Sequence, residues 1–136
     1  MKILLVEDDP PLRKTAAAAL KLCGHAITCA ADGIEALASA YQSCPDLVVL
    51  DLHMPDMDGW EFLERFRSRP ACAAIPVVVM SAAHRVNVDE LDVQAFFAKP
   101  FDLDELIDAI EELLSVPTNE GRIHAAPRNE RAHGEG

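Results

Sequence analysis

Four side chains able to take part in phosphoryl or metal chemistry stand at the ends of short apolar segments. They are the carboxylates of Asp8 and Asp51, the hydroxyl group of Ser81 and the ammonium group of Lys99. The apolar segments, typical of buried β-strands, are residues 2–6, 46–50, 75–80 and 95–98. If these strands are parallel, their carboxyl ends meet in one cleft and bring the four side chains together. Such a set can hold a divalent metal beside a nucleophilic carboxylate, which suits phosphoryl transfer.

The sequence between these segments predicts helices and one further strand, at residues 26–30. The helices are expected after the cap Asp9, from Ile34 to about Cys44, from Gly59 to Pro70, within residues 82–93, and after the cap Asp102. The helix after Gly59 is expected to turn Trp60, Leu63 and Phe66 inward. The stretch 82–93 is poorly periodic, so we expect a short or frayed helix there.

This alternation of five strands with five helices predicts a doubly wound α/β fold. Right-handed crossovers would give a five-stranded parallel sheet with helices on both faces. In open sheets of this kind, sites form beyond the carboxyl ends of the strands, where the strand order reverses. Residues 117–136 are polar and low in apolar side chains, so we expect a flexible tail after one domain at residues 1–116.

The chain is acidic, with a formal net charge of −11. An acidic domain repels nucleic acid and anionic membranes, so we expect no direct binding to either. We find neither an apolar stretch long enough to span a membrane nor a signal-peptide pattern, and we expect a cytoplasmic protein. The cysteines have no C-x-x-C spacing, so we expect buried or semi-buried free thiols at Cys23, Cys29, Cys44 and Cys72.

Four motifs together closely resemble receiver domains of two-component response regulators. They are ILLVEDDP, VVLDLHMPDMDGWEFL, VVVMSA and AKPF, in this order and at these separations. The resemblance covers roughly residues 1–116 and implies the flavodoxin-like (CheY-like) form of the fold, with strand order 2-1-3-4-5. It further implies a phosphoacceptor signalling domain, and because we expect no output domain, we interpret the chain as a stand-alone response regulator. Such a domain is not an enzyme in the usual sense, since it catalyses only its own phosphorylation and dephosphorylation.

The resemblance assigns the phosphoacceptor and a magnesium site. Asp51 matches the family's phosphoacceptor, whose carboxylate attacks the phosphorus of a phosphohistidine and becomes an acyl phosphate. Glu7 and Asp8 match the acidic pair that binds Mg²⁺. Asp8, Asp51 and the backbone carbonyl of His53 would bind the ion directly, and Glu7 would act mainly through water.

Three further positions match residues that contact or sense the phosphoryl group. Lys99 matches the lysine that contacts the phosphoryl oxygens, and the resemblance implies a cis bond between Lys99 and Pro100. Ser81 matches the hydroxyl that hydrogen-bonds the phosphoryl group. Phe96 occupies the aromatic switch position, where an aromatic ring moves inward when that hydroxyl is drawn toward the phosphate.

The chain departs from the family pattern between Ser81 and Lys99. These residues are 18 positions apart, roughly one helical turn fewer than is usual for the family. The missing residues predict a short fourth helix. This leaves open whether the segment 82–94 supports the usual output face, which is made by the fourth helix, fifth strand and fifth helix.

Other kinds of protein were weighed against a receiver. A phosphatase of the haloacid-dehalogenase type expects an aspartate two residues after its nucleophile, where this chain has His53. A calcium-binding loop around Asp56 and Asp58 would place Met54 and Arg65 at its first and last ligand positions. A structural pseudo-receiver is disfavoured because the acidic pair, phosphoacceptor, hydroxyl and lysine are all present.

The expected partners are proteins. They would be a sensor histidine kinase, a histidine phosphotransfer protein or both, together with a downstream protein target. The chain could be a diffusible regulator, an intermediate in a phosphorelay, or a phosphate sink for a histidine phosphotransfer protein. The sequence names neither the kinase nor the target.

Overall fold

A computed structural model describes residues 1–54, 56–82 and 93–115 of the chain. The strands in this part of the chain are β1 (Lys2–Val6), β2 (Ala26–Ala30), β3 (Leu47–Asp51), β4 (Val77–Ser81) and β5 (Ala95–Ala98). The α-helices are α1 (Pro10–Leu22), α2 (Gly33–Gln42), α3 (Gly59–Arg67) and α5 (Leu103–Ser115), and a 3-10 helix, η1 (Pro70–Cys72), follows α3. The helix expected within 82–93 and the tail expected at 117–136 fall almost wholly or wholly outside the described residues.

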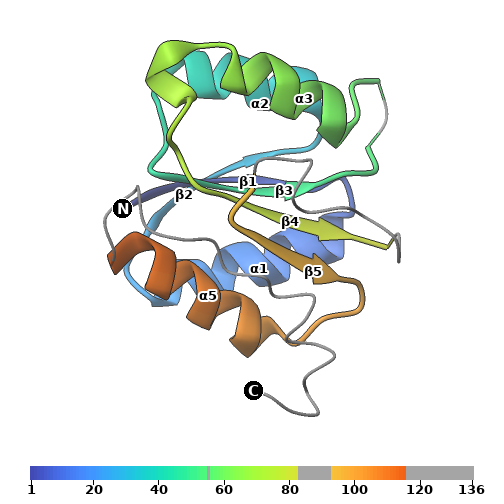
Figure 1. Ribbon diagram of the computed structural model, residues 1–136. Coiled ribbons are helices and arrows are strands. Elements are labelled where there is room, and N and C mark those ends of the chain that lie inside the picture. Colours follow the sequence, from blue (N-terminus) through green and yellow to red (C-terminus); the bar gives the residue numbers. More distant parts are fainter. Residues whose placement is uncertain (55, 83–92, 116–136) are drawn as a thin grey trace.

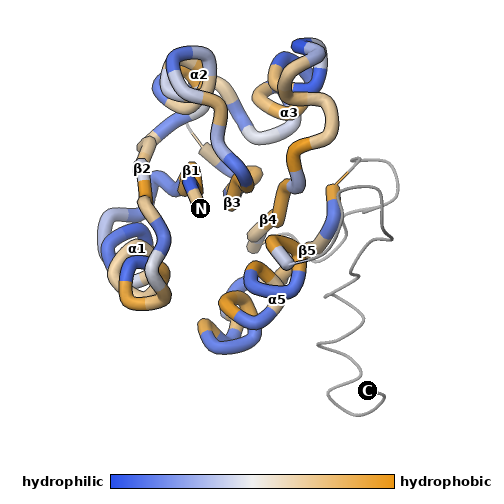
Figure 2. Tube along the Cα trace, turned by 90° about the vertical axis from the view of Figure 1, so that its left-hand side faces the viewer, coloured by the Kyte–Doolittle hydropathy of each residue, from blue (hydrophilic) through white to orange (hydrophobic). Residues whose placement is uncertain are grey.

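The five strands form one parallel sheet in the order β2-β1-β3-β4-β5. Helices α1 and α5 cover one face, and α2 and α3 cover the other (Figure 1). Figure 2 shows the sheet from the side, between the two helical layers. This confirms the doubly wound fold and its strand order. The order reverses between β1 and β3, so the carboxyl ends of these two strands border the crevice where sites form in such sheets.

Alternation along β1 explains how its apolar residues, Ile3 to Val6, serve both helical layers. Ile3 and Leu5 pack with α1 and α5, whereas Leu4 and Val6 pack with α2 and α3. Successive side chains of a strand point to opposite faces, so a sheet covered on both sides needs apolar residues at every position. Strands β3 and β4 are buried throughout for the same reason.

Three of the helices begin at an aspartate that caps the first turn. The side chains of Asp9, Asp32 and Asp58 each accept a hydrogen bond from the backbone N–H three residues later, at 2.8–3.1 Å. This bond satisfies one of the free N–H groups at the start of a helix. The capping role expected for Asp9 is therefore confirmed. Asp58, weighed as part of a calcium loop, accepts its bond as the cap of α3.

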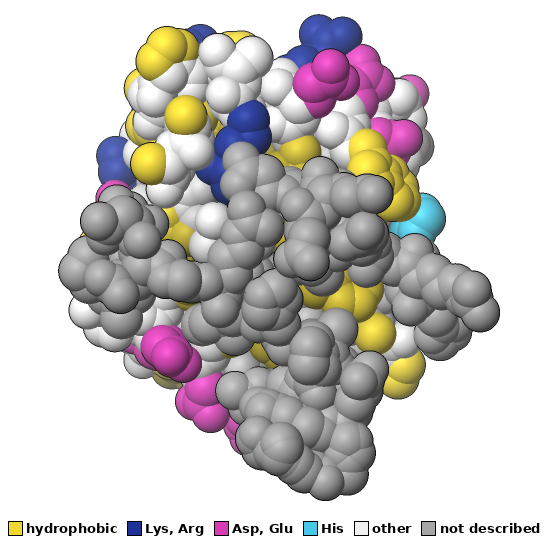
Figure 3. Space-filling view, viewed as in Figure 1, with side chains coloured by type: hydrophobic (Ala, Val, Ile, Leu, Met, Phe, Trp, Pro, Cys, Tyr) yellow, Lys and Arg dark blue, Asp and Glu magenta, His cyan; other side chains and the backbone are white. Residues whose placement is uncertain are grey.

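The outer side of α5 is acidic. Its exposed carboxylates are those of Asp104, Asp108, Glu111 and Glu112. Figure 3 shows acidic side chains on the α5 side of the molecule and a mixed group of acidic and basic side chains near α3. No helix in the described part of the chain is long and apolar enough to cross a membrane.

Two expectations about burial are wrong. Trp60 is not turned inward but is 41% exposed, while Phe62, Leu63 and Phe66 fill the inner side of α3. Among the four cysteines only Cys72 is buried, and the other three thiols are exposed. All four are free, as expected.

Candidate functional site

The polar residues at the strand ends lie at one edge of the sheet. Asp51 and Ser81 are the last residues of β3 and β4. The sequence predicted that these strands end one residue earlier, so that both side chains would directly follow them. Glu7 and Asp8 directly follow β1, and Lys99 directly follows β5. The backbone N–H of Lys99 donates to the carbonyl oxygen of Ser81 at 2.8 Å, which ties β5 to β4 at this edge. Because all five strands are parallel, these residues at and just beyond the strand ends lie at the same edge of the sheet, as predicted.

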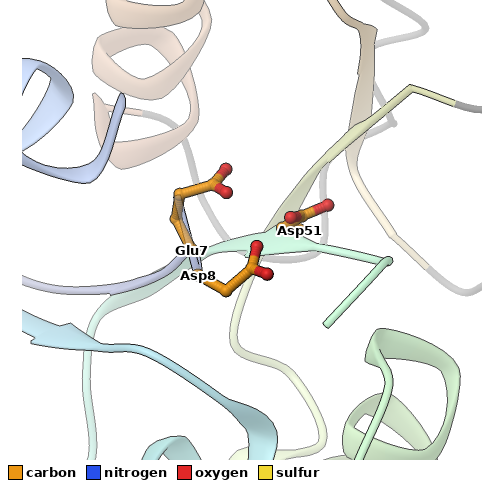
Figure 4. A group of neighbouring side chains, drawn as sticks. All are labelled: Glu7, Asp8 and Asp51. Carbon is orange, nitrogen blue, oxygen red and sulfur yellow. The ribbon is translucent and has the colours of Figure 1, made fainter. Parts of the chain in front are cut away.

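Three carboxylates form the centre of the site. One oxygen from each of Glu7, Asp8 and Asp51 lies within 4.8 Å of the others. Figure 4 shows the three side chains together at the ends of β1 and β3. Glu7 is fully buried and Asp51 is 3% exposed, whereas Asp8 is exposed. A set of carboxylate oxygens is the donor type that Mg²⁺ prefers, and an open side leaves room for the waters that this ion keeps.

The ammonium group of Lys99 holds the two buried carboxylates. Its Nζ donates to Oε1 of Glu7 at 2.9 Å and to Oδ2 of Asp51 at 3.4 Å. Burial alone would lower the pKa of Lys99, but the hydrogen bond to Glu7 and the charges of both carboxylates raise that pKa above its ordinary value. Lys99 is therefore a fixed positive charge beside Asp51. The Lys99–Pro100 bond is cis, as the resemblance implied.

Burial also makes the two enclosed carboxyl groups hard to ionise. Desolvation raises the pKa of Glu7 to about 7, against the opposing hydrogen bonds from Lys99 and from the backbone of Asp9. Desolvation raises the pKa of Asp51 as well, against a hydrogen bond from the His53 backbone and the charge of Lys99. The single ammonium group of Lys99 thus does not cancel the rise in pKa that burial causes in the two carboxyl groups. A divalent cation would favour their ionised forms, so the donor set fits Mg²⁺.

The segment after Asp51 is held by the start of α3. The backbone N–H of His53 donates to Oδ1 of Asp51 at 3.1 Å, and the rings of His53 and Trp60 meet edge to face at 5.4 Å. Gly59 donates its N–H to the Leu52 carbonyl at 2.9 Å. A Cβ at Gly59 would lie only 2.6 Å from the Leu52 Cα and 2.8 Å from the Asp51 carbonyl oxygen.

The sequence did not predict that Gly59 and Trp60 support the segment after Asp51. The sequence feature that could have indicated it is a glycine at the first position of a helix that begins soon after the candidate nucleophile. A residue without a side chain there indicates that two stretches of backbone approach closely.

Ser81 and Phe96 lie on neighbouring strands near this edge. Ser81 is fully buried, and Phe96 is 3% exposed and packs in the core layer shared with α2 and α3. Phe96 pairs with Val79, and Ser81 pairs with Ala98, in the parallel ladder between β4 and β5. The aromatic ring is thus inward in this conformation.

An apolar cavity of about 590 Å³ opens beside Lys99. It lies between α1, which contributes Leu12 and Thr15, and the segment that runs from Lys99 to the start of α5. Pro100, Phe101 and Leu103 belong to its apolar lining.

Comparison with known proteins points to one family. The model of the response regulator receiver domain matches residues 3–111. The sporulation initiation phosphotransferase F of Bacillus subtilis is 35% identical over 122 residues, which cover 87% of this chain and 97% of that protein. The DNA-binding dual master transcriptional regulator RpaA of Synechocystis is 33% identical over 117 residues, which cover 83% of this chain and 48% of that regulator. The chain thus spans about half the length of several relatives that it matches.

Solved structures give the same result. A putative response regulator from Chloroflexus aurantiacus is similar with a TM-score of 0.78 and 27% identity, covering 85% of this chain and 98% of that one. The receiver domain of the sensor histidine kinase PA1611 from Pseudomonas aeruginosa is similar with a TM-score of 0.78 and 28% identity, at the same coverage of both chains. That structure is described as having a magnesium ion coordinated in its active site cleft.

Proposed function

Because this chain belongs to the family of response regulator receiver domains, which are signalling domains of two-component systems, we propose that it accepts a phosphoryl group on Asp51 from a phosphohistidine. One observation carries the proposal. The buried Asp51 carboxylate lies at a strand end with a fixed ammonium group 3.4 Å from Oδ2 and a second and third carboxylate beside it. Such an arrangement positions a nucleophile and neutralises charge, which is most of what phosphoryl transfer requires.

The proposed reaction uses few groups of the chain. An oxygen of Asp51 attacks the phosphorus, the new O–P bond forms, and the P–N bond to the donor imidazole breaks with its electron pair remaining on nitrogen. Lys99 would contact oxygens of a phosphoryl group on Asp51, since its Nζ already lies 3.4 Å from Oδ2 of that residue. When Mg²⁺ is bound, it supplies further positive charge for the transferred oxygens.

The acids divide the metal site between them in this proposal. Asp8 and Asp51, with the backbone carbonyl of His53, would bind Mg²⁺ directly. Both oxygens of Glu7 already accept hydrogen bonds, Oε1 from Lys99 at 2.9 Å and Oε2 from the Asp9 backbone at 3.1 Å. This occupancy supports an indirect role for Glu7, through water.

Ser81 and Phe96 form the proposed switch. The Ser81 hydroxyl would hydrogen-bond the phosphoryl group, since β4 is the immediate neighbour of the strand that ends in Asp51. Phe96 would report the change through packing alone, because phenylalanine has no hydroxyl group. Its buried position next to Val79 supports this role.

A histidine kinase or a histidine phosphotransfer protein would supply the phosphoryl group. The apolar cavity beside Lys99 supports docking of such a protein on the α1 side of the site. A phosphorelay intermediate is the second candidate function, favoured by similarity along nearly the whole length of a relative named a phosphotransferase. One relative is named as DNA-binding, and the match covers 48% of its length. For this chain, the absence of direct nucleic-acid binding stays a prediction.

Incubation of the full chain with acetyl phosphate or phosphoramidate and Mg²⁺, followed by intact mass measurement, tests the proposal. We expect a gain of one phosphoryl group that is stable in acid and labile in base. Asp51→Asn should abolish the gain, whereas Asp108→Asn, an exposed carboxylate of α5, should leave it unchanged. No gain in the wild type, or an undiminished gain in Asp51→Asn, would contradict the proposal.

A further inference from the structure

Two thiol groups lie against each other at the end of the sheet opposite the acidic site. Cys44 is exposed and lies in the connection from α2 to β3, while Cys72 is 1% exposed and ends η1, before β4. Their Sγ atoms are 3.9 Å apart, although 28 positions separate the two residues in sequence. The Cys44 thiol also points to the Ala71 carbonyl oxygen, at 3.7 Å. The exposed thiol is thus turned onto the segment that carries the buried one.

We propose that Cys44 and Cys72 are a redox modification site, at which a peroxide converts the two thiols into a disulfide bond. The Sγ atoms must approach from 3.9 Å to about 2.05 Å. This inference depends on the positions of the thiols and not on the proposed phosphoryl chemistry.

Exposure sets the order of the two steps. The Cys44 thiolate attacks one oxygen of the peroxide, so that an S–O bond forms, the O–O bond breaks, and the peroxide is reduced to an alcohol, or to water in the case of hydrogen peroxide. The sulfur of Cys72 then attacks the sulfenic acid on Cys44. An S–S bond forms, the S–O bond breaks, and the hydroxyl group leaves with the Cys72 proton as water.

The buried partner is suited to the second step. Burial raises the pKa of Cys72, so this thiol stays protonated and out of reach of an oxidant in solution. The nearby charges of Arg69 and Arg67 act in the opposite direction on the same pKa. These charges assist loss of the proton when the sulfenic acid on Cys44 is attacked.

Two arginines also hold the segment that carries Cys72. One guanidinium nitrogen of Arg67 donates to the carbonyl oxygens of Cys72, Ala73 and Ile75, at 3.0, 3.2 and 2.6 Å. The Arg69 guanidinium lies 4.0 Å from the ring centre of Tyr41 on α2. Helix α2 leads directly into the connection with Cys44. These contacts therefore hold the segment with Cys72 next to the segment with Cys44.

The test uses the full chain, reduced, freed of reductant, and treated with hydrogen peroxide in equimolar amount. We expect the mass to fall by two hydrogen atoms and non-reducing peptide maps to link Cys44 with Cys72. Dithiothreitol should restore the starting mass. Cys44→Ser should remove the link, and Cys29→Ser, which removes another exposed thiol, should retain it. Links to Cys23 or Cys29, linked dimers, or oxygen addition without a link would overturn the proposal.

A second measurement asks whether the link forms in the native fold. A bond across 28 positions restricts the unfolded chain, so the linked wild type should melt higher by about 5 to 15 °C. Cys44→Ser should melt at the same temperature before and after peroxide. A linked wild type that melts below the reduced chain would show that the bond distorts the fold, and would overturn the proposal of a native, poised pair.

Discussion

The buried carboxyl group of Glu7 makes the stability of the metal-free chain depend on pH. Glu7 is fully buried, and desolvation raises its pKa from 4.5 to about 7 although Lys99 and the Asp9 backbone donate hydrogen bonds to it. In the unfolded chain the same group is in water and titrates near its ordinary value. Between these two pH values the folded chain holds a proton that the unfolded chain has released.

The sign and size of the effect follow from this difference. The stability contributed by the protonated group is fully present below about pH 4.5 and is lost as the pH rises through about 7. Each pH unit in this window costs about 1.4 kcal/mol, so the free energy of unfolding should fall by about 3 kcal/mol up to about pH 8. Burial raises the pKa of Asp51 too, so its contribution has the same sign. Mg²⁺ binds the ionised forms and should stabilise the chain more at about pH 8 than at about pH 6.

Urea unfolding followed by circular dichroism measures this effect, with a chelator present, between about pH 5 and pH 8. The key variant is Glu7→Gln, which cannot ionise but keeps an oxygen that can accept the Lys99 hydrogen bond. Its free energy of unfolding should change much less with pH than that of the wild type. Glu64→Gln, at an exposed position of α3, should follow the wild type. Parallel curves for wild type and Glu7→Gln between about pH 6 and pH 8 would show that Glu7 does not titrate with a raised pKa in the folded chain.

Three substitutions test other parts of the fold and site. Lys99→Ala should slow phosphoryl uptake by Asp51 about 10- to 100-fold, because the lost ammonium lies 3.4 Å from its carboxylate; an unchanged rate of mass gain would contradict this role. Gly59→Ala should lower the free energy of unfolding by about 2 to 4 kcal/mol, since the added Cβ would lie 2.6 Å from a main-chain atom. An unchanged urea midpoint would show that α3 can shift without cost. Arg67→Ala should cost about 2 to 3 kcal/mol because three carbonyl groups lose a charged donor. Arg65→Ala, which breaks only an exposed pair, should cost less than about 0.5 kcal/mol in the same assay.

The sheet and the position of the site could be predicted because both depend on local patterns. Short runs of apolar, β-branched residues identify strands that are buried on both faces, and their alternation with helices makes the strands parallel. Once the strands are parallel, Asp8, Asp51, Ser81 and Lys99 must lie at the same edge. This conclusion does not depend on side-chain packing. It therefore holds although β3 and β4 each end one residue later than the sequence predicted.

On α3, hydropathy correctly placed Leu63 and Phe66 inward but wrongly placed Trp60 there. The inner side of this helix consists of Gly59, Phe62, Leu63 and Phe66, which follow the helical spacing of three and four residues. Its first position must be glycine because a Cβ would collide with the backbone after Asp51. Hydropathy passes over a glycine and selects the neighbouring Trp60, which in fact lies beside His53. The proximity of Cys44 and Cys72 was equally hidden, since it depends on how two connections far apart in sequence meet.

The alternation of β1 explains why two adjacent acids differ so strongly. Glu7 continues the series of Ile3 and Leu5, which faces α1 and α5, whereas Asp8 continues the series of Leu4 and Val6 on the opposite face. Figure 4 shows the two side chains leaving the chain in different directions, with Asp51 beside both. The side of Glu7 is closed by Lys99, and the side of Asp8 is open to solvent. A cation can therefore approach Asp51 from the side of Asp8. On the other side Lys99, bound to the buried Glu7 at 2.9 Å, lies 3.4 Å from Oδ2 of the proposed phosphoacceptor.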